Sequence, residues 1–116
     1  MRIAICASEA APYVKSGGLG DVMEALPAAL QRIDGNEVAL FLPYYCKIKR
    51  NDRFPTEKVA DCLVSLGWRH QYCGLFSLES RGVTWYFVDN EHYFARPRLY
   101  GEFDDGERFA FFCKAV

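Results

Sequence analysis

The segment Lys15-Ser16-Gly17-Gly18-Leu19 places a cation beside two adjacent glycines. It follows a short apolar run and precedes a stretch with helical spacing. The first N–H groups of a helix have no intrahelical acceptor, and this end of the helix carries a partial positive charge. Glycines keep side chains away from these donors, and the lysine adds a full charge that can reach the same anion. The pattern therefore suits a phosphate or a diphosphate.

Two commoner phosphate-binding motifs do not describe this segment. The lysine precedes the glycines, unlike the lysine of GxxxxGK[ST], and the glycine spacing differs from that of GxGxxG. The residues alone leave two interpretations open. One is a phosphate site, and the other is a tight turn that needs glycine for its backbone angles, with a surface lysine nearby.

Alternating elements are predicted on either side of the segment. Residues 2–8 read as a buried strand, residues 18–33 as a helix and residues 37–42 as a second strand. This order implies a right-handed crossover and a parallel strand pair. In such doubly wound α/β sheets ligands bind beyond the carboxyl ends of the strands, where the lysine and glycines fall.

The predicted helix 18–33 has one apolar face, and Pro27 should kink it or split it in two. The residues expected on that face are Val22, Leu26, Ala29, Leu30 and Ile33. Further along, residues 47–58 read as a surface loop with one helical turn. Residues 59–66, 71–79 and 83–88 read as strands, some of them antiparallel, with a hairpin turn at residues 80–82. A capping box over residues 104–107 predicts a last helix, which carries Phe109 and Phe112 on one face.

Composition narrows the class of protein. The chain has 116 residues, 51% of them hydrophobic, and a net charge of −1, which gives no electrostatic reason to expect nucleic acid as a partner. No apolar run approaches the ~20 residues of a membrane span, and no leader peptide is recognisable. The five cysteines form no CxxC motif, so we expect reduced thiols packed as small hydrophobic groups in a cytoplasmic protein.

Other chemistry-bearing residues favour ordinary structural roles. His70 and His92 form no ligand cluster, and we expect both to be surface or structural histidines. No metal-ligand spacing is present, so no metal or other cofactor is expected. Trp68 and Trp85 lie in strand-like context, which predicts core packing for both.

The chain as a whole resembles the N-terminus of bacterial glycogen synthases and plant starch synthases. In that family a Lys-x-Gly-Gly-Leu signature near the start belongs to the ADP-glucose site. The resemblance covers essentially the whole chain. It is carried by residues 6–30 around the signature and by matching segments at residues 42–45, 66–69, 87–91, 99–101 and 106–112.

The resemblance implies a fold and an activity. The fold is a Rossmann-like α/β three-layer sandwich, with residues 1–116 forming the N-terminal part of the first domain of a two-domain, GT-B type glycosyltransferase. The second, nucleotide-binding domain is expected to be absent from this chain. The family transfers glucose from ADP-glucose to the nonreducing end of an α-1,4-glucan with retention. We expect the isolated chain to be inactive, because the second domain is absent. We also expect it to self-associate, because Phe109 and Phe112 would lack the elements that cover them.

The resemblance also assigns roles to residues. Lys15 should pair with the donor's phosphates, and Gly17 and Gly18 should offer backbone N–H groups to the same region. Asp21 should lie on the sugar side, although a carboxylate in the first helical turn is also favoured by the helix dipole alone. Glu9 either lines the cleft or braces the turn. The family often has tyrosine where this chain has Phe94, so the roles of Phe94 and the adjacent Tyr93 stay open.

Two other classes of function remain alternatives on the residues alone. The chain has the length of a stand-alone phosphate- or nucleotide-binding module of Rossmann-like kind. Its aromatic content of 16% also fits a noncatalytic interaction domain that binds protein or glycan. Substituting Lys15 discriminates between these readings, because only a phosphate site depends on it.

Overall fold

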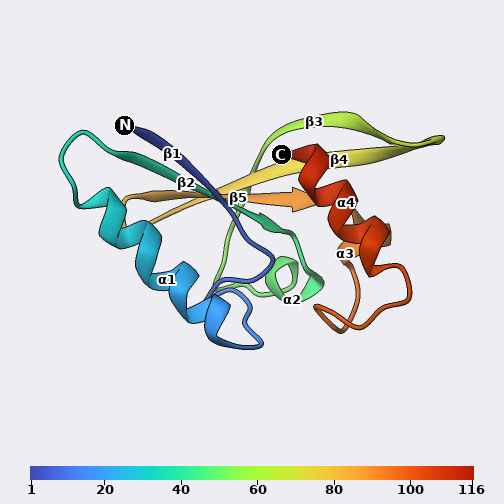
Figure 1. The fold of residues 1–116 in the computed structure, drawn as a ribbon, viewed down its shortest axis with the longest axis horizontal. Coiled ribbons are helices and arrows are strands. Elements are labelled where there is room, and N and C mark those ends of the chain that lie inside the picture. Colours follow the sequence, from blue (N-terminus) through green and yellow to red (C-terminus); the bar gives the residue numbers. More distant parts are fainter.

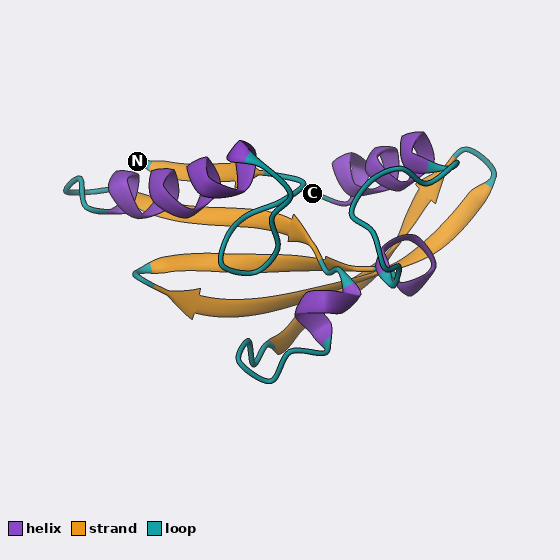
Figure 2. Cartoon of the chain, turned by 90° about the horizontal axis from the view of Figure 1, so that it is seen from below, coloured by secondary structure: helices purple, strands orange, loops and turns teal.

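The computed structural model describes residues 1–116 and contains one five-stranded sheet in the order β1-β2-β5-β4-β3. The strands are β1 (Arg2–Cys6), β2 (Glu37–Pro43), β3 (Glu57–Leu66), β4 (Arg69–Ser80) and β5 (Val83–Asp89). The helices are α1 (Gly18–Gln31), α2 (Cys46–Lys49), α3 (Glu91–Phe94) and α4 (Asp105–Ala115). Figures 1 and 2 show α1 and α4 at opposite ends of the elongated molecule.

The sheet combines two patterns of pairing. β1, β2 and β5 run parallel, and β4 and β3 continue the sheet antiparallel. The predicted β1–α1–β2 unit with its parallel pair is therefore confirmed. The hairpin turn at residues 80–82 is also confirmed, and both Arg81 (φ 54°) and Gly82 (φ 76°) adopt the positive φ that such tight turns use. β1 has no partner on its outer side, so it is an edge strand.

Helix α1 packs against the sheet with a different face from the predicted one. Of the predicted residues, Leu30 packs on the core, beside Met23 and the fully buried Pro27. The other four predicted residues, Val22, Leu26, Ala29 and Ile33, are exposed. Pro27 also does not split the helix, which is continuous from Gly18 to Gln31. The side of α1 that packs against β2 and β5 is therefore not its most hydrophobic side, which is exposed to solvent.

Helix α4 differs from its prediction at its start and in its packing. The Asp104 side chain makes no capping hydrogen bond and instead pairs with Arg96, so the predicted capping box is wrong. Phe112 is buried within the chain together with Phe111, whereas Phe109 is half-buried. The cover that we expected to be missing is therefore largely supplied by the chain itself.

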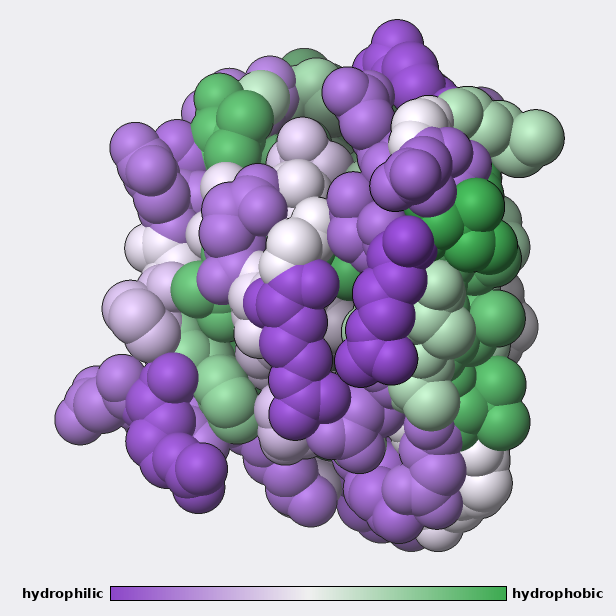
Figure 3. All heavy atoms as spheres, turned by 90° about the vertical axis from the view of Figure 1, so that its left-hand side faces the viewer, coloured by the Kyte–Doolittle hydropathy of each residue, from purple (hydrophilic) through white to green (hydrophobic).

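Several apolar side chains remain at the surface. A hollow of about 720 Å³ lies on the sheet beside Phe41 and Tyr86, whose rings stack 5.0 Å apart. Figure 3 shows hydrophobic side chains along one border of an end face that is otherwise mostly hydrophilic. Trp68 is 82% exposed in the β3–β4 hairpin, so core packing was wrong for Trp68 and right for Trp85.

The cysteines and histidines lie mostly at the surface. All five cysteines are free, but only Cys73 is buried, and Cys6, Cys62 and Cys113 are exposed rather than packed inside. His70 and His92 both lie at the surface, as predicted. None of the helices is long and apolar enough to cross a membrane.

Candidate functional site

Lys15 and Gly17 lie in the connection that leads from the carboxyl end of β1 to α1, and Gly18 is the first residue of α1. The middle of this connection is anchored in the core. Tyr13 is buried with its ring 4.7 Å from those of Phe54 and Trp85, and the Ala11 amide donates to the Gly20 carbonyl. Residues 15–18, which we call the glycine loop, are all exposed beyond this anchor. The fold therefore presents the glycine loop to the outside on a fixed base.

Glu9 is the buried centre of the loop. Its side chain is 2% exposed, and its Oε1 accepts from the amides of Ser16 (3.3 Å), Gly17 (3.1 Å) and Gly20 (3.0 Å). Its Oε2 accepts from the Ser16 hydroxyl at 2.5 Å and from the Tyr100 hydroxyl at 2.8 Å. Of the two roles left open for Glu9, these contacts show that it braces the loop.

The ionisation of Glu9 follows from these contacts. Burial opposes the charge and is the largest single influence. The hydroxyls of Ser16 and Tyr100, with the amides of Ser16 and Gly17, together outweigh it and lower the pKa of Glu9 from 4.5 to about 2. Glu9 is therefore ionised at neutral pH, and it already accepts hydrogen bonds from the N–H groups of Ser16, Gly17 and Gly20.

The two adjacent glycines are not required by the geometry of the chain. Gly17 has an extended backbone (φ −163°), and neither glycine has a positive φ. A Cβ atom on Gly17 or Gly18 would meet nothing within 4 Å. The turn-geometry interpretation therefore has no support in the backbone angles. The glycines keep a space clear that no residue of this chain occupies.

The amides of the two glycines differ in availability. The Gly17 N–H donates to Glu9, so it is not free to meet an anion in this structure. Gly18 is the first residue of α1, where an N–H has no intrahelical acceptor, and it makes no contact with Glu9. Gly20 is the glycine that packing demands, because a Cβ there would overlap the Cβ of Lys15 and lie 3.3 Å from Glu9 Oε1. Sequence reasoning missed Gly20.

Lys15 and Asp21 are brought together at the mouth of the loop. Lys15 Nζ lies 2.6 Å from Asp21 Oδ1, and both side chains are about half exposed. The hydrogen bond with Asp21 is the main reason why the pKa of Lys15 is raised, so the amine is charged at neutral pH. An anion that approaches Lys15 competes with Asp21 for it.

Tyr100 reaches the loop from 91 residues away in the sequence. Its hydroxyl bonds to Ser8 Oγ at 2.7 Å and to Glu9 Oε2 at 2.8 Å, and burial is the main cause that raises its pKa. Nearby, Tyr45 donates to the Ser8 carbonyl at 2.7 Å. The matching segment at residues 99–101 was the signal that could have pointed to Tyr100, although spacing alone gave it no role.

Tyr93 and Phe94 do not lie at an open surface. Both are fully buried, Phe94 packs edge-on against Tyr45 at 5.8 Å, and the Tyr93 hydroxyl bonds to Glu107 at 3.0 Å. Neither ring is placed to stack on a sugar in this structure. The family's tyrosine position is here part of the aromatic core beneath α4.

The fold and the loop define the class of protein. The mixed α/β sheet matches a GT-B starch synthase structure, the catalytic domain of starch synthase IV from Arabidopsis thaliana bound to ADP and acarbose. The TM-score is 0.82 at 30% identity, covering 98% of this chain and 24% of that one. A family model described as the starch synthase catalytic domain matches residues 2–116. The chain belongs to this family.

Curated relatives give the same assignment. The chain is 53% identical to glycogen synthase from Bacillus subtilis (strain 168) and 50% identical to glycogen synthase from Anoxybacillus flavithermus, in both cases over all 116 residues. The chain spans 24% of the length of each of these relatives. The resemblance stated from the motifs is thereby confirmed.

Proposed function

We propose that residues 1–116 form the N-terminal part of the catalytic domain of a glycogen synthase that works in the cytoplasm. The complete enzyme transfers glucose from ADP-glucose to the nonreducing end of an α-1,4-glucan with retention. The nucleotide-binding second domain lies outside these residues, so this chain alone is inactive. The free thiols suit a reducing compartment, and the relatives are bacterial glycogen synthases.

One observation carries the proposal for the site. An exposed, charged Lys15 stands next to two glycines whose Cβ positions face open space at the start of α1. The leaving diphosphate gains negative charge as the sugar becomes oxocarbenium-like. Fixed donors aimed at that charge lower the barrier. Lys15 and the Gly18 amide supply such donors. Gly17 has no free N–H to offer, but its missing side chain lets the ligand come close to the backbone.

Asp21 has the sugar-side role in this proposal. When the diphosphate takes Lys15, the Asp21 carboxylate loses its partner and becomes free to accept hydrogen bonds from hydroxyl groups. Its place in the first turn of α1 keeps it favoured by the helix dipole while it does so. The Lys15–Asp21 pair thus holds both groups ready before the substrate arrives.

The test is the Lys15→Ala substitution in the complete synthase, with glucose incorporation from ADP-glucose as the readout. Loss of one preorganised donor to the leaving group costs about 2.7–4 kcal/mol of transition-state stabilisation, so we expect kcat/KM to fall by about 10²–10³-fold. Lys58→Ala is the matched control, because Lys58 forms an equally exposed ion pair with Asp61 at 2.7 Å, away from the loop. Equal activities of the two variants at an unchanged melting temperature would exclude the proposed site.

A further inference from the structure

We propose that Tyr100 is a positioning residue, which holds the glycine loop in its binding shape by fixing the carboxylate of Glu9. The inference rests on the proposed function, because the loop is the proposed donor site. It also gives a role to the segments at residues 99–101 and 106–112, which the donor site itself does not use.

The contact between Tyr100 and Glu9 controls the loop because the two oxygens of the Glu9 carboxylate accept from different sets of donors. Oε1 accepts from the amides of Ser16 and Gly17 in the glycine loop and from the amide of Gly20 in α1. Oε2 accepts only from the hydroxyls of Ser16 and Tyr100. Ser16 is part of the loop and moves with it. Tyr100 is therefore the donor to Oε2 that comes from outside the glycine loop, and it fixes the rotation of the carboxylate relative to the rest of the molecule.

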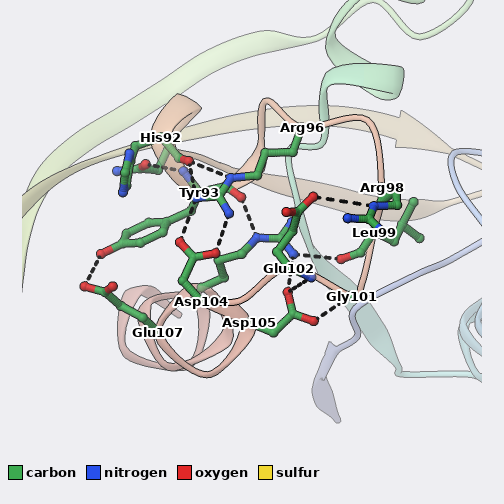
Figure 4. Close-up of polar contacts among 12 residues, drawn as sticks. His92, Tyr93, Arg96, Arg98, Leu99, Gly101, Glu102, Asp104, Asp105 and Glu107 are labelled. Atoms are coloured by element: carbon green, nitrogen blue, oxygen red, sulfur yellow. Dashed lines mark hydrogen bonds and ion pairs between the residues drawn. The ribbon is translucent and has the colours of Figure 1, made fainter.

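Tyr100 is itself held on both sides by α4. The carbonyl of Leu99 accepts from Arg108 Nη1 at 3.0 Å, and the amide of Gly101 donates to Asp105 Oδ2 at 2.8 Å. Arg108 is fully buried and also bonds to Asp105 at 2.8 Å. Figure 4 shows the hydrogen bond between Gly101 and Asp105. Gly101 has φ 89°, a conformation that favours glycine at this point.

An ion pair also fixes the chain just before residues 99–101. The Arg96 guanidinium pairs with Asp104, with Nη2 to Oδ2 at 2.7 Å, and also donates to the carbonyl of His92 (Figure 4). The Tyr100 ring lies 5.8 Å from that of Phe109 on α4. The position of α4 is thus transmitted through Tyr100 and Glu9 to the amides of the glycine loop.

The test in the complete synthase is Tyr100→Phe, which keeps the ring and removes the hydroxyl. A small misplacement of binding groups has a large effect on reaction geometry. We expect KM for ADP-glucose to rise about tenfold, with KM for the glucan unchanged and kcat altered less than about threefold. Tyr44→Phe is the control, because it removes the hydroxyl of another tyrosine, which contacts Thr56 Oγ1 at 2.7 Å, away from the loop.

A direct readout of the loop uses the 116-residue chain. Amide hydrogen exchange should quicken about tenfold at Gly17 and Gly20 in Tyr100→Phe, and not at the amides of β2 and β5. If Tyr100→Phe matches Tyr44→Phe in both exchange and KM while Lys15→Ala loses activity, the positioning role is overturned and the proposed function stands. If Lys15→Ala keeps full activity while exchange at Gly17 quickens, the proposed function fails and the coupling of Tyr100 to the loop remains.

Discussion

At the scale of single residues, Glu9 determines the electrostatics of the glycine loop. A buried carboxylate with five donors is costly to protonate, because each donor would then face a weaker acceptor. It also reduces the positive potential of the loop, since it neutralises amides that would otherwise face an incoming anion. Lys15 therefore carries more of the proposed attraction for a diphosphate than the helix start does.

The lowered pKa of Glu9 predicts acid sensitivity of the fold. The folded-state pKa of about 2 lies below the ordinary 4.5, so the stabilisation is present above pH 4.5 and is lost as the pH falls toward 2. One pKa unit corresponds to about 1.4 kcal/mol, so the contribution is on the order of 3 kcal/mol. We expect Glu9→Gln to lower the free energy of unfolding at pH 7 and to approach the wild type at pH 2, measured by urea unfolding.

Glu37→Gln is the control for this pH series. Glu37 is an exposed carboxylate whose ion pair is with the exposed Arg2 at 3.6 Å, and surface pairs of this kind contribute little. A constant difference between Glu9→Gln and the wild type from pH 7 to pH 2 would contradict the assignment of Glu9 as the group that titrates.

Candidate site residues could be named from the sequence only where the chemistry was local. Lys15, Gly17, Gly18 and Asp21 lie within seven positions, and a charged residue beside glycines at a helix start points to an anion by itself. Tyr100 was not predictable in this way, because its contact with Glu9 depends on the path of the chain through the whole sheet. The roles of Tyr93 and Phe94 could not be decided from the sequence, because an aromatic side chain can either stack on a sugar or pack in a core.

At the scale of elements, the three glycines at the junction of the β1–α1 connection with α1 serve two different purposes. Gly20 lets α1 approach Lys15 and Glu9, so its missing side chain serves packing within the chain. Gly17 and Gly18 leave space that faces outward. Substitutions at Gly20 and at Gly17 therefore test different things: whether the fold needs the space, or whether a ligand does.

We expect Gly20→Ala to destabilise the fold by about 1–3 kcal/mol, the usual cost of overpacking, because the backbone of Lys15 would have to shift. Gly17→Ala should change the free energy of unfolding by less than about 0.5 kcal/mol, since its backbone is extended and its surroundings are open. Thermal unfolding of the two variants checks this. A larger loss of stability in Gly17→Ala than in Gly20→Ala would refute the division.

Helix α1 also shows the limit of reading a helix from its apolar spacing. The existence and bounds of the helix were predicted closely, as residues 18–33 against Gly18–Gln31. Its buried side was not, because periodicity identifies a stripe and not the surface that meets it. The side that packs includes Pro27, whose ring fills the contact although the residue costs a backbone hydrogen bond. Trp68 was misplaced for a similar reason, since strand-like residues continue into an exposed hairpin.

At the scale of the whole molecule, the exposed stripe of α1 supports the expected self-association by a different route from the one predicted. Leu19, Val22 and Leu26 are exposed along α1 and Ile33 is exposed just beyond its end, whereas Phe112, through which contact was expected, is buried. An unpaired apolar stripe of this kind favours contact between copies of the chain.

We expect the chain to form dimers or larger species at high concentration and Leu26→Glu to shift it toward monomer, measured by light scattering. Phe103→Ser is the control, because Phe103 is fully exposed but lies away from α1. A wild-type chain that stays monomeric, or a shift produced by Phe103→Ser alone, would count against the stripe as the contact.

The unpaired outer side of β1 bears on where the glycine loop sits. An edge strand offers a row of free N–H and C=O groups to which a further strand can hydrogen-bond. A parallel strand added there would place a second connection on the opposite side of β1, and neighbouring connections that diverge in this way open a crevice between them. Lys15 follows the carboxyl end of β1, so a strand added there would bring its connection to the same edge of the sheet, and exclusion of water from a crevice at that edge would strengthen the action of the charge on Lys15.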